Sequence, residues 1–170
     1  MVMNFKKLFE TQKALDYHIV EEKGLEGQNL IAKKVVALQV ELSELMNELP
    51  EVFKFWSNKK NDYEKALEEF VDSLHFILSI GIEKGYSVEE LIVMLSGNSG
   101  VSVGQDVLKQ FKYLNGAVSD FSFDGTKYSY EELLLYFINL GESLGFTTDQ
   151  IEAAYYAKNE VNHERQISGY

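Results

Sequence analysis

The chain has 170 residues, a length that fits one domain with a substantial hydrophobic core. Its formal net charge of −11 argues against a nucleic-acid polymer as the usual partner, because phosphate backbones bind where Lys and Arg cluster. The chain contains no cysteine, which excludes disulfides, thiolate metal sites and a cysteine nucleophile. A small anionic substrate is compatible with this charge if bound cations reverse the local field.

Apolar residues at helical spacing dominate the sequence, and no alternating strand pattern competes with them. In chain order the pattern predicts helices at about 4–22, 29–49, 62–84, 87–96, 103–115, 129–144 and 148–163. We therefore expect an all-α fold, a helical bundle that forms a single domain over residues 1–170.

The sequence offers no segment that we expect to bind or enter a membrane. Its longest apolar stretch runs from Leu74 to Ile82 and is too short to span a bilayer. The first residues lack the apolar core and the small-residue cleavage site of a signal peptide. We expect a cytoplasmic protein without a membrane partner.

The predicted helix at 29–49 carries two stripes of side chains. The first stripe is apolar and faces the core; it consists of Ile31, Val35, Leu38, Leu42, Leu45 and Leu49. The second stripe lies beside it and holds Glu41, Glu44 and Glu48. No cation follows Glu41 or Glu44 at a spacing that would pair with it within the helix.

The predicted helix at 62–84 repeats the acidic pattern with Glu69 and Asp72, and it is apolar on nearly every other side. A helix of this kind is usually buried, so Asp72 is expected near the interior. Buried carboxylates repel one another unless cations bind them, and ligand sets made only of oxygen suit Mg²⁺ or Mn²⁺. A solvated acidic face is the alternative, and the spacing alone does not decide between the two.

The segment from about 97 to 128 differs from the rest of the chain. It contains Gly97, Gly100, Gly104, Gly116 and Gly125 together with several serines, and Phe121-Ser-Phe-Asp-Gly125 is typical of a turn. We expect a looser insertion around one helix.

Several motifs follow one another in a characteristic order. They are Gln12-Lys-Ala-Leu-Asp16, Glu41-Leu-Ser-Glu44, Phe53-Lys-Phe-Trp56-Ser-Asn58-Lys59, Glu68-Glu69-Phe-Val-Asp72-Ser-Leu-His75 and Lys158-Asn-Glu-Val-Asn162-His-Glu-Arg165-Gln166-Ile-Ser-Gly-Tyr170. Taken together they resemble the dimeric all-α dUTPases, a family related to the MazG-like and dCTP pyrophosphatases. The resemblance covers most of the chain except about 97–128.

The resemblance implies a homodimer that hydrolyses dUTP to dUMP and pyrophosphate with Mg²⁺, or Mn²⁺, and a metal-activated water. The metal ligands implied by the ExxE and ExxD motifs are Glu41, Glu44, Glu69 and Asp72. A neighbouring carboxylate would take the proton of the water, and Glu44 is the first choice before Glu41.

The resemblance also implies which residues bind the substrate. Lys158, Asn162 and Arg165 share one helical face that can reach the phosphates, and Gln166 and Tyr170 belong to the same C-terminal motif. The nucleoside contacts implied are Gln12, Asp16, Trp56 and His75. Asp16 departs from the family pattern, because some relatives carry Asn there.

Two alternatives remain open at this point. One keeps the chemistry and changes the base, as in a dCTP or MazG-like pyrophosphohydrolase. The other is a different class of protein, an acidic helical regulator that binds a protein partner.

Overall fold

The computed structural model describes residues 3–98 and 106–169. This part of the chain forms eight helices and no strand, so the prediction of an all-α fold is confirmed. The helices are α1 (Phe5–Lys23), α2 (Ile31–Asn47), α3 (Pro50–Phe53), α4 (Tyr63–Glu83), α5 (Val88–Asn98), α6 (Val107–Asp124), α7 (Lys127–Ser143) and α8 (Thr148–Ser168).

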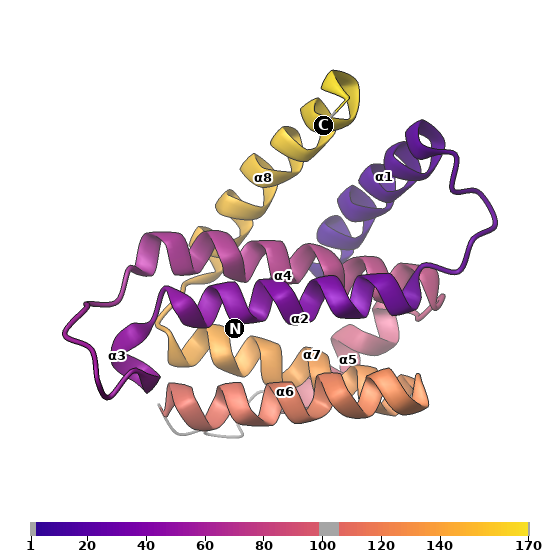
Figure 1. The fold of residues 1–170 in the computed structure, drawn as a ribbon. Helices are drawn as coiled ribbons and strands as arrows, with labels where there is room; N and C mark the ends of the chain where they lie inside the picture. Colours follow the sequence, from indigo (N-terminus) through magenta and orange to yellow (C-terminus); the bar gives the residue numbers. More distant parts are fainter. Residues whose placement is uncertain (1–2, 99–105, 170) are drawn as a thin grey trace.

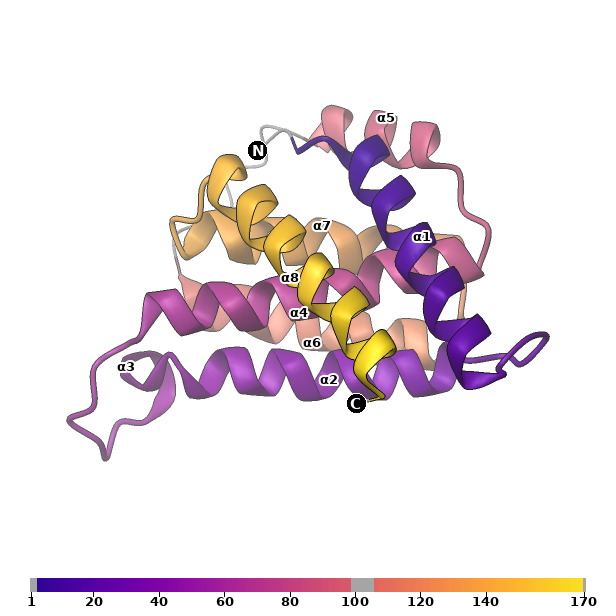
Figure 2. The same cartoon turned by 90° about the horizontal axis from the view of Figure 1, so that it is seen from above.

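The helices lie in three layers (Figure 1). The antiparallel pair of α2 and α4 forms the middle layer, and the antiparallel pair of α6 and α7 covers one side of it. On the other side α1 and α8 lie next to each other and cross over α4, as the view from above shows (Figure 2). The short helix α3 belongs to the connection between α2 and α4.

The predicted apolar stripe of α2 faces the core, with Val35, Leu38, Leu42 and Leu45 buried. Helix α4 is covered by neighbours from several directions, which explains why apolar residues surround it. Asp62 caps this helix, because its side chain accepts a hydrogen bond from the Lys65 amide. The two acidic motifs are therefore held on two firmly packed, adjacent helices.

The segment from 97 to 128 is more ordered than its composition suggested. Helix α6 continues to Asp124, so Phe121–Asp124 form its last turn rather than a separate turn. It buries Gln110 and contributes four residues to the hydrophobic core: Leu114, Ala117, Val118 and Phe121. Part of the expected looser insertion, residues 99–105, lies outside the described residues.

Gly81 allows a close approach near the C-terminal end of α4. The Tyr130 hydroxyl of α7 donates a hydrogen bond to the Ile77 carbonyl over 2.9 Å, directly beside Gly81. A Cβ atom at Gly81 would lie 2.4 Å from that hydroxyl oxygen.

None of the described helices is both long and apolar enough to cross a bilayer.

Candidate active site

A cleft of about 410 Å³ lies where α1 and α8 cross over α2 and α4. All four helices contribute to its wall, together with two residues of the loop between α1 and α2. Most of the site residues predicted from the sequence line it: Gln12, Asp16, Glu41, Asp72, His75, Lys158, Asn162 and Arg165.

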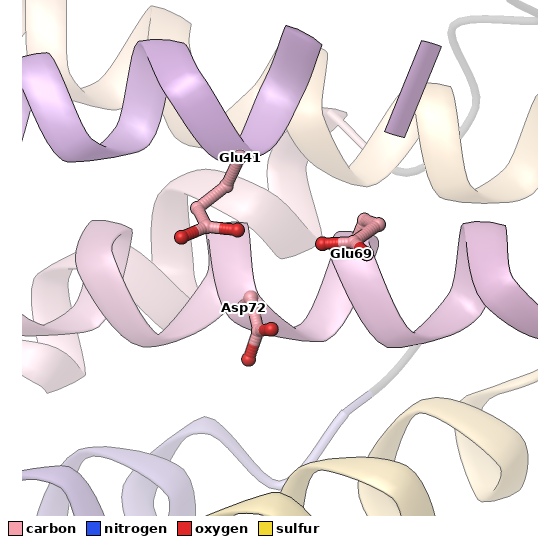
Figure 3. A group of neighbouring side chains, drawn as sticks. All are labelled: Glu41, Glu69 and Asp72. Atoms are coloured by element: carbon pink, nitrogen blue, oxygen red, sulfur yellow. The ribbon is translucent and has the colours of Figure 1, made fainter. Parts of the chain in front are cut away.

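Three carboxylates lie close together, and two of them, Glu41 and Asp72, line this cleft (Figure 3). Glu41 comes from α2, and Glu69 and Asp72 come from α4; one oxygen of each lies within 4.8 Å of the others. All three side chains are half-buried. Because α2 and α4 run side by side, the two acidic motifs meet across the helix pair.

The three carboxyl groups disfavour each other's ionisation. Burial, together with the charges of Asp72, Glu44 and Glu69, raises the pKa of Glu41 to about 7. The pKa of Glu69 and that of Asp72 are also raised, in both cases mainly by burial. A divalent cation with a preference for oxygen ligands would relieve this repulsion, so the donor set fits Mg²⁺ or Mn²⁺.

Glu44 lies beside this cluster and not in it. Its side chain is exposed, and it does not line the cleft. Its charge nevertheless raises the pKa of both Glu41 and Glu69, which places it close to them.

Helix α8 brings positive charge to the same cleft. Lys158 Nζ lies 2.5 Å from Asp72 Oδ2, and this ion pair joins α8 to α4. Asn162 and Arg165 follow on the same face of the helix, and Arg165 Nη1 donates to Asn162 Oδ1 over 3.4 Å. Gln166 is the next residue along the helix, and its Nε2 donates to the Asn162 backbone carbonyl.

Buried polar side chains form a network on the α1 side of the cleft. Gln12 Nε2 donates to Asp16 Oδ1 over 2.8 Å, and the Ser79 hydroxyl donates to Asp16 Oδ2 over 2.7 Å. Gln12 Oε1 lies 2.7 Å from His75 Nδ1 and 2.8 Å from the Tyr155 hydroxyl. Burial lowers the pKa of His75 to about 3, so its ring is neutral at physiological pH.

A histidine pair joins α1 to α8 at a position next to the cleft-lining residue Asn162. His18 Nδ1 and His163 Nδ1 are 2.8 Å apart, and their rings stack with centroids 5.1 Å apart. His163 follows Asn162 along α8, so this contact helps to fix the helix that carries the cleft's cations.

Trp56 and Gln166 are predicted substrate contacts that do not line the cleft. Trp56 lies in the loop after α3, is 67% exposed and packs edge-on against Phe55, away from the cleft-lining residues. Tyr170 lies outside the described residues.

Sequence reasoning missed Tyr155 and did not assign Lys34 a role. Tyr155 is three residues before Lys158, on the same face of α8, so the spacing was the available signal. Lys34 lines the cleft, 2.6 Å from Glu83 Oε2 and 3.9 Å from Asp16 Oδ2. The contacts of Tyr155 and Lys34 join different helices, so they depend on how the helices pack.

Comparison with known proteins gave a match to a protein family and no match to a curated protein. A protein-family model described as dUTPase matches residues 4–170, nearly the whole chain. A search of the curated proteins found no match.

Proposed function

The chain belongs to the dimeric all-α dUTPase family and is a dUTP diphosphatase, and from this premise we propose how it works. The proposed reaction is the Mg²⁺-dependent hydrolysis of dUTP to dUMP and pyrophosphate. The observation that supports it most is one cleft that joins a carboxylate cluster, a cationic helix face and a buried polar network.

In this proposal Glu41, Glu69 and Asp72 hold the metal, with Glu44 as a further ligand from the next turn of α2. When bound, Mg²⁺ neutralises phosphate charge and lowers the pKa of a water molecule, so that the water can act as a nucleophile. We assign proton acceptance to Glu44, because it is exposed beside the cluster; Glu41 is the alternative.

Lys158, Asn162 and Arg165 bind the phosphates in this proposal. Arg suits paired contacts with phosphate oxygens, and Lys supplies a point charge. Lys158 also pairs with Asp72, so its ammonium group partly neutralises the cluster. Gln166 supports Asn162 from the same helix, and Tyr170 is proposed as a contact from the chain's last position.

The nucleoside is proposed to lie against α1 and α4. Gln12, Asp16 and His75 supply polar atoms there, and Leu15, Ile19 and Phe76 supply apolar wall. A mainly apolar wall with a few convergent polar groups is typical of a site that binds a flat, uncharged ring.

We further propose that the protein is a homodimer, as expected for this family, and that α2 lies at the interface. In the view of Figure 1 no other helix lies in front of α2. Its outer face exposes Val36 and Val40, and the following loop exposes Phe55 (94% exposed) and Trp56. Light scattering should give twice the 19.5 kDa chain mass, and Val40→Asp should dissociate the dimer.

The matched control for this dimer is Val93→Asp, which places the same charge on an exposed residue of α5. It should leave the dimer intact. A monomeric wild-type protein would rule out the dimer, and equal dissociation by both variants would rule out the α2 interface.

The activity is tested by offering the purified protein dUTP, dCTP, dTTP, dATP, dGTP and UTP with Mg²⁺ and identifying the products. We expect the highest kcat/KM with dUTP and equal amounts of dUMP and pyrophosphate. A preference for dCTP would move the assignment to the related dCTP pyrophosphatases, and release of dUDP would reject the pyrophosphohydrolase reaction.

A further inference from the structure

The buried network beside the cleft determines which ring nitrogen of His75 carries its proton. The members are Gln12, Asp16, His75, Ser79 and Tyr155. Gln12 and His75 are buried and Tyr155 is fully buried, so the network is a part of the helix packing. This network determines which hydrogen-bonding groups the proposed nucleoside site offers. The identity of the ligand rests on the proposed function.

Asp16 sets the orientation of the Gln12 amide. A carboxylate can only accept hydrogen bonds, so the Gln12 group that faces Asp16 Oδ1 over 2.8 Å must be the NH₂. The Ser79 hydroxyl donates to the second oxygen over 2.7 Å, and the Lys34 ammonium group lies 3.9 Å from it. Burial raises the pKa of Asp16, and these contacts act against that rise because they favour the ionised form.

With its NH₂ turned to Asp16, Gln12 presents Oε1 to two neighbours. An amide oxygen is an acceptor with two lone pairs, so both neighbours must donate. The Tyr155 hydroxyl donates its one proton to Gln12 over 2.8 Å, since the Leu8 carbonyl, another acceptor near it, is 3.4 Å away. His75 Nδ1, at 2.7 Å, must therefore carry a proton.

The other ring nitrogen of His75 is then left as an acceptor. Burial keeps the ring neutral, so a proton on Nδ1 leaves a lone pair on Nε2. The ring is stacked on Tyr155 with centroids 4.2 Å apart, which holds its orientation. His75 lines the cleft, and no hydrogen-bond partner for Nε2 exists among the residues that the structure describes. A buried acceptor without a donor is unfavourable, so a ligand that supplies one gains affinity.

We propose that Asp16 is a positioning residue: acting through Gln12, it fixes His75 as the Nδ1–H tautomer, and Nε2 accepts a hydrogen bond from an N–H or O–H group of the bound nucleoside. In a deoxyuridine nucleotide the donors are N3–H of the base and the 3′-hydroxyl of the sugar. Cytosine has no proton on N3, so an acceptor facing that position disfavours dCTP.

The tautomer is tested by ¹⁵N NMR of histidine-labelled protein without nucleotide or metal. Wild-type His75 should show a protonated Nδ1 and an unprotonated Nε2. Asp16→Ala frees the Gln12 amide to turn over, so a population protonated on Nε2 should appear. Ser79→Ala is the matched control: it truncates the other partner of the same carboxylate, leaves the Gln12 contact intact and should leave the tautomer unchanged.

A wild-type His75 protonated on Nε2 would overturn the proposal, whether or not the variants fold. So would a folded Asp16→Ala protein with an unchanged tautomer. Because this readout needs no substrate, it is independent of the proposed activity: a protein with the expected tautomer that fails to hydrolyse dUTP contradicts the function alone.

Kinetics with substrate analogues identify the donor. N3-methyl-dUTP lacks the base donor, and 2′,3′-dideoxy-UTP lacks the sugar donor. Wild-type protein should lose about ten-fold in kcat/KM with one of them, as expected for one hydrogen bond, and His75→Leu should no longer distinguish that analogue from dUTP. Undiminished discrimination in His75→Leu, or none in the wild type, would overturn acceptance by Nε2.

Discussion

Glu41 is the residue at which the proposed metal binding and the stability of the metal-free protein oppose each other. Its pKa is raised to about 7 in the folded chain, first by burial and then by Asp72, Glu44 and Glu69. The folded protein therefore holds a proton on Glu41 between about pH 4.5 and pH 7 that the unfolded chain has lost, and stability falls as pH rises through this range. Above pH 7 the loss of stability caused by ionised Glu41 has reached its full value.

We predict that Glu41→Gln stabilises the metal-free protein at pH 8 and has little effect near pH 4.5. Allowing for solvent screening of a half-exposed group, the gain is about 1 kcal/mol, which raises the Tm by roughly 2–4 °C. The same variant should lose the stabilisation that Mg²⁺ gives the wild type. Thermal unfolding at both pH values checks this; a lower Tm at pH 8, or an unchanged response to Mg²⁺, would contradict it.

Lys158 is expected to have opposite effects on the metal and on the substrate. Its ammonium group pairs with Asp72, so Lys158→Met removes a competing cation and should tighten Mg²⁺ binding without nucleotide. It also removes a proposed phosphate contact, so kcat/KM for dUTP should fall by about 10- to 100-fold. Calorimetric Mg²⁺ titration and steady-state kinetics measure the two effects. A variant that loses both Mg²⁺ affinity and kcat/KM for dUTP would argue against the assigned role.

At the scale of elements, α6 contributes to the core through one face. Phe121 is 1% exposed, whereas Phe123, two residues along the same helix, is 90% exposed. Phe121→Ala should therefore cost about 3–5 kcal/mol of unfolding free energy, and Phe123→Ala less than about 0.5 kcal/mol. Urea denaturation of the pair tests this, and equal effects would mean that the end of α6 does not pack as described.

Helical periodicity predicted most of these elements because each helix buries a regular apolar stripe. The ends of α1, α2, α4 and α7 lie within two residues of the ranges expected from the sequence. Helix α6 was predicted too short, because the glycines and serines around it weakened the local signal, while Phe121 gains its burial from α7. Helix α8 continues five residues beyond its predicted end at 163.

The acidic part of the site followed from spacing, whereas the polar network did not. Glu41, Glu69 and Asp72 share regular positions on two helices, so the packing of α2 on α4 was enough to bring them together. The contact between Tyr155 and Gln12 joins residues 143 positions apart and depends on how α8 crosses α1. Trp56 was assigned from its motif, but the loop that carries it leads away from the cleft of its own chain.

For the whole molecule, a net charge of −11 must be reconciled with a substrate that is itself highly anionic. The cleft resolves this locally: its wall contains Lys33, Lys34, Lys158 and Arg165, and its carboxylates fit a divalent cation. We therefore expect binding of a triphosphate to depend on the proposed metal as well as on these side chains.

The most direct test of this account is dUTP turnover by wild-type, Glu41→Gln and Asp72→Asn proteins with Mg²⁺, with excess chelator, and after Mg²⁺ is restored. We predict dUMP and pyrophosphate from the wild type only when Mg²⁺ is present, with full recovery on its return. Both variants should remain helical by circular dichroism and lose at least about 100-fold in rate. Undiminished dUTP hydrolysis in excess chelator, or near-normal turnover by either folded variant, would contradict the assignment of the carboxylate cluster as the catalytic metal site.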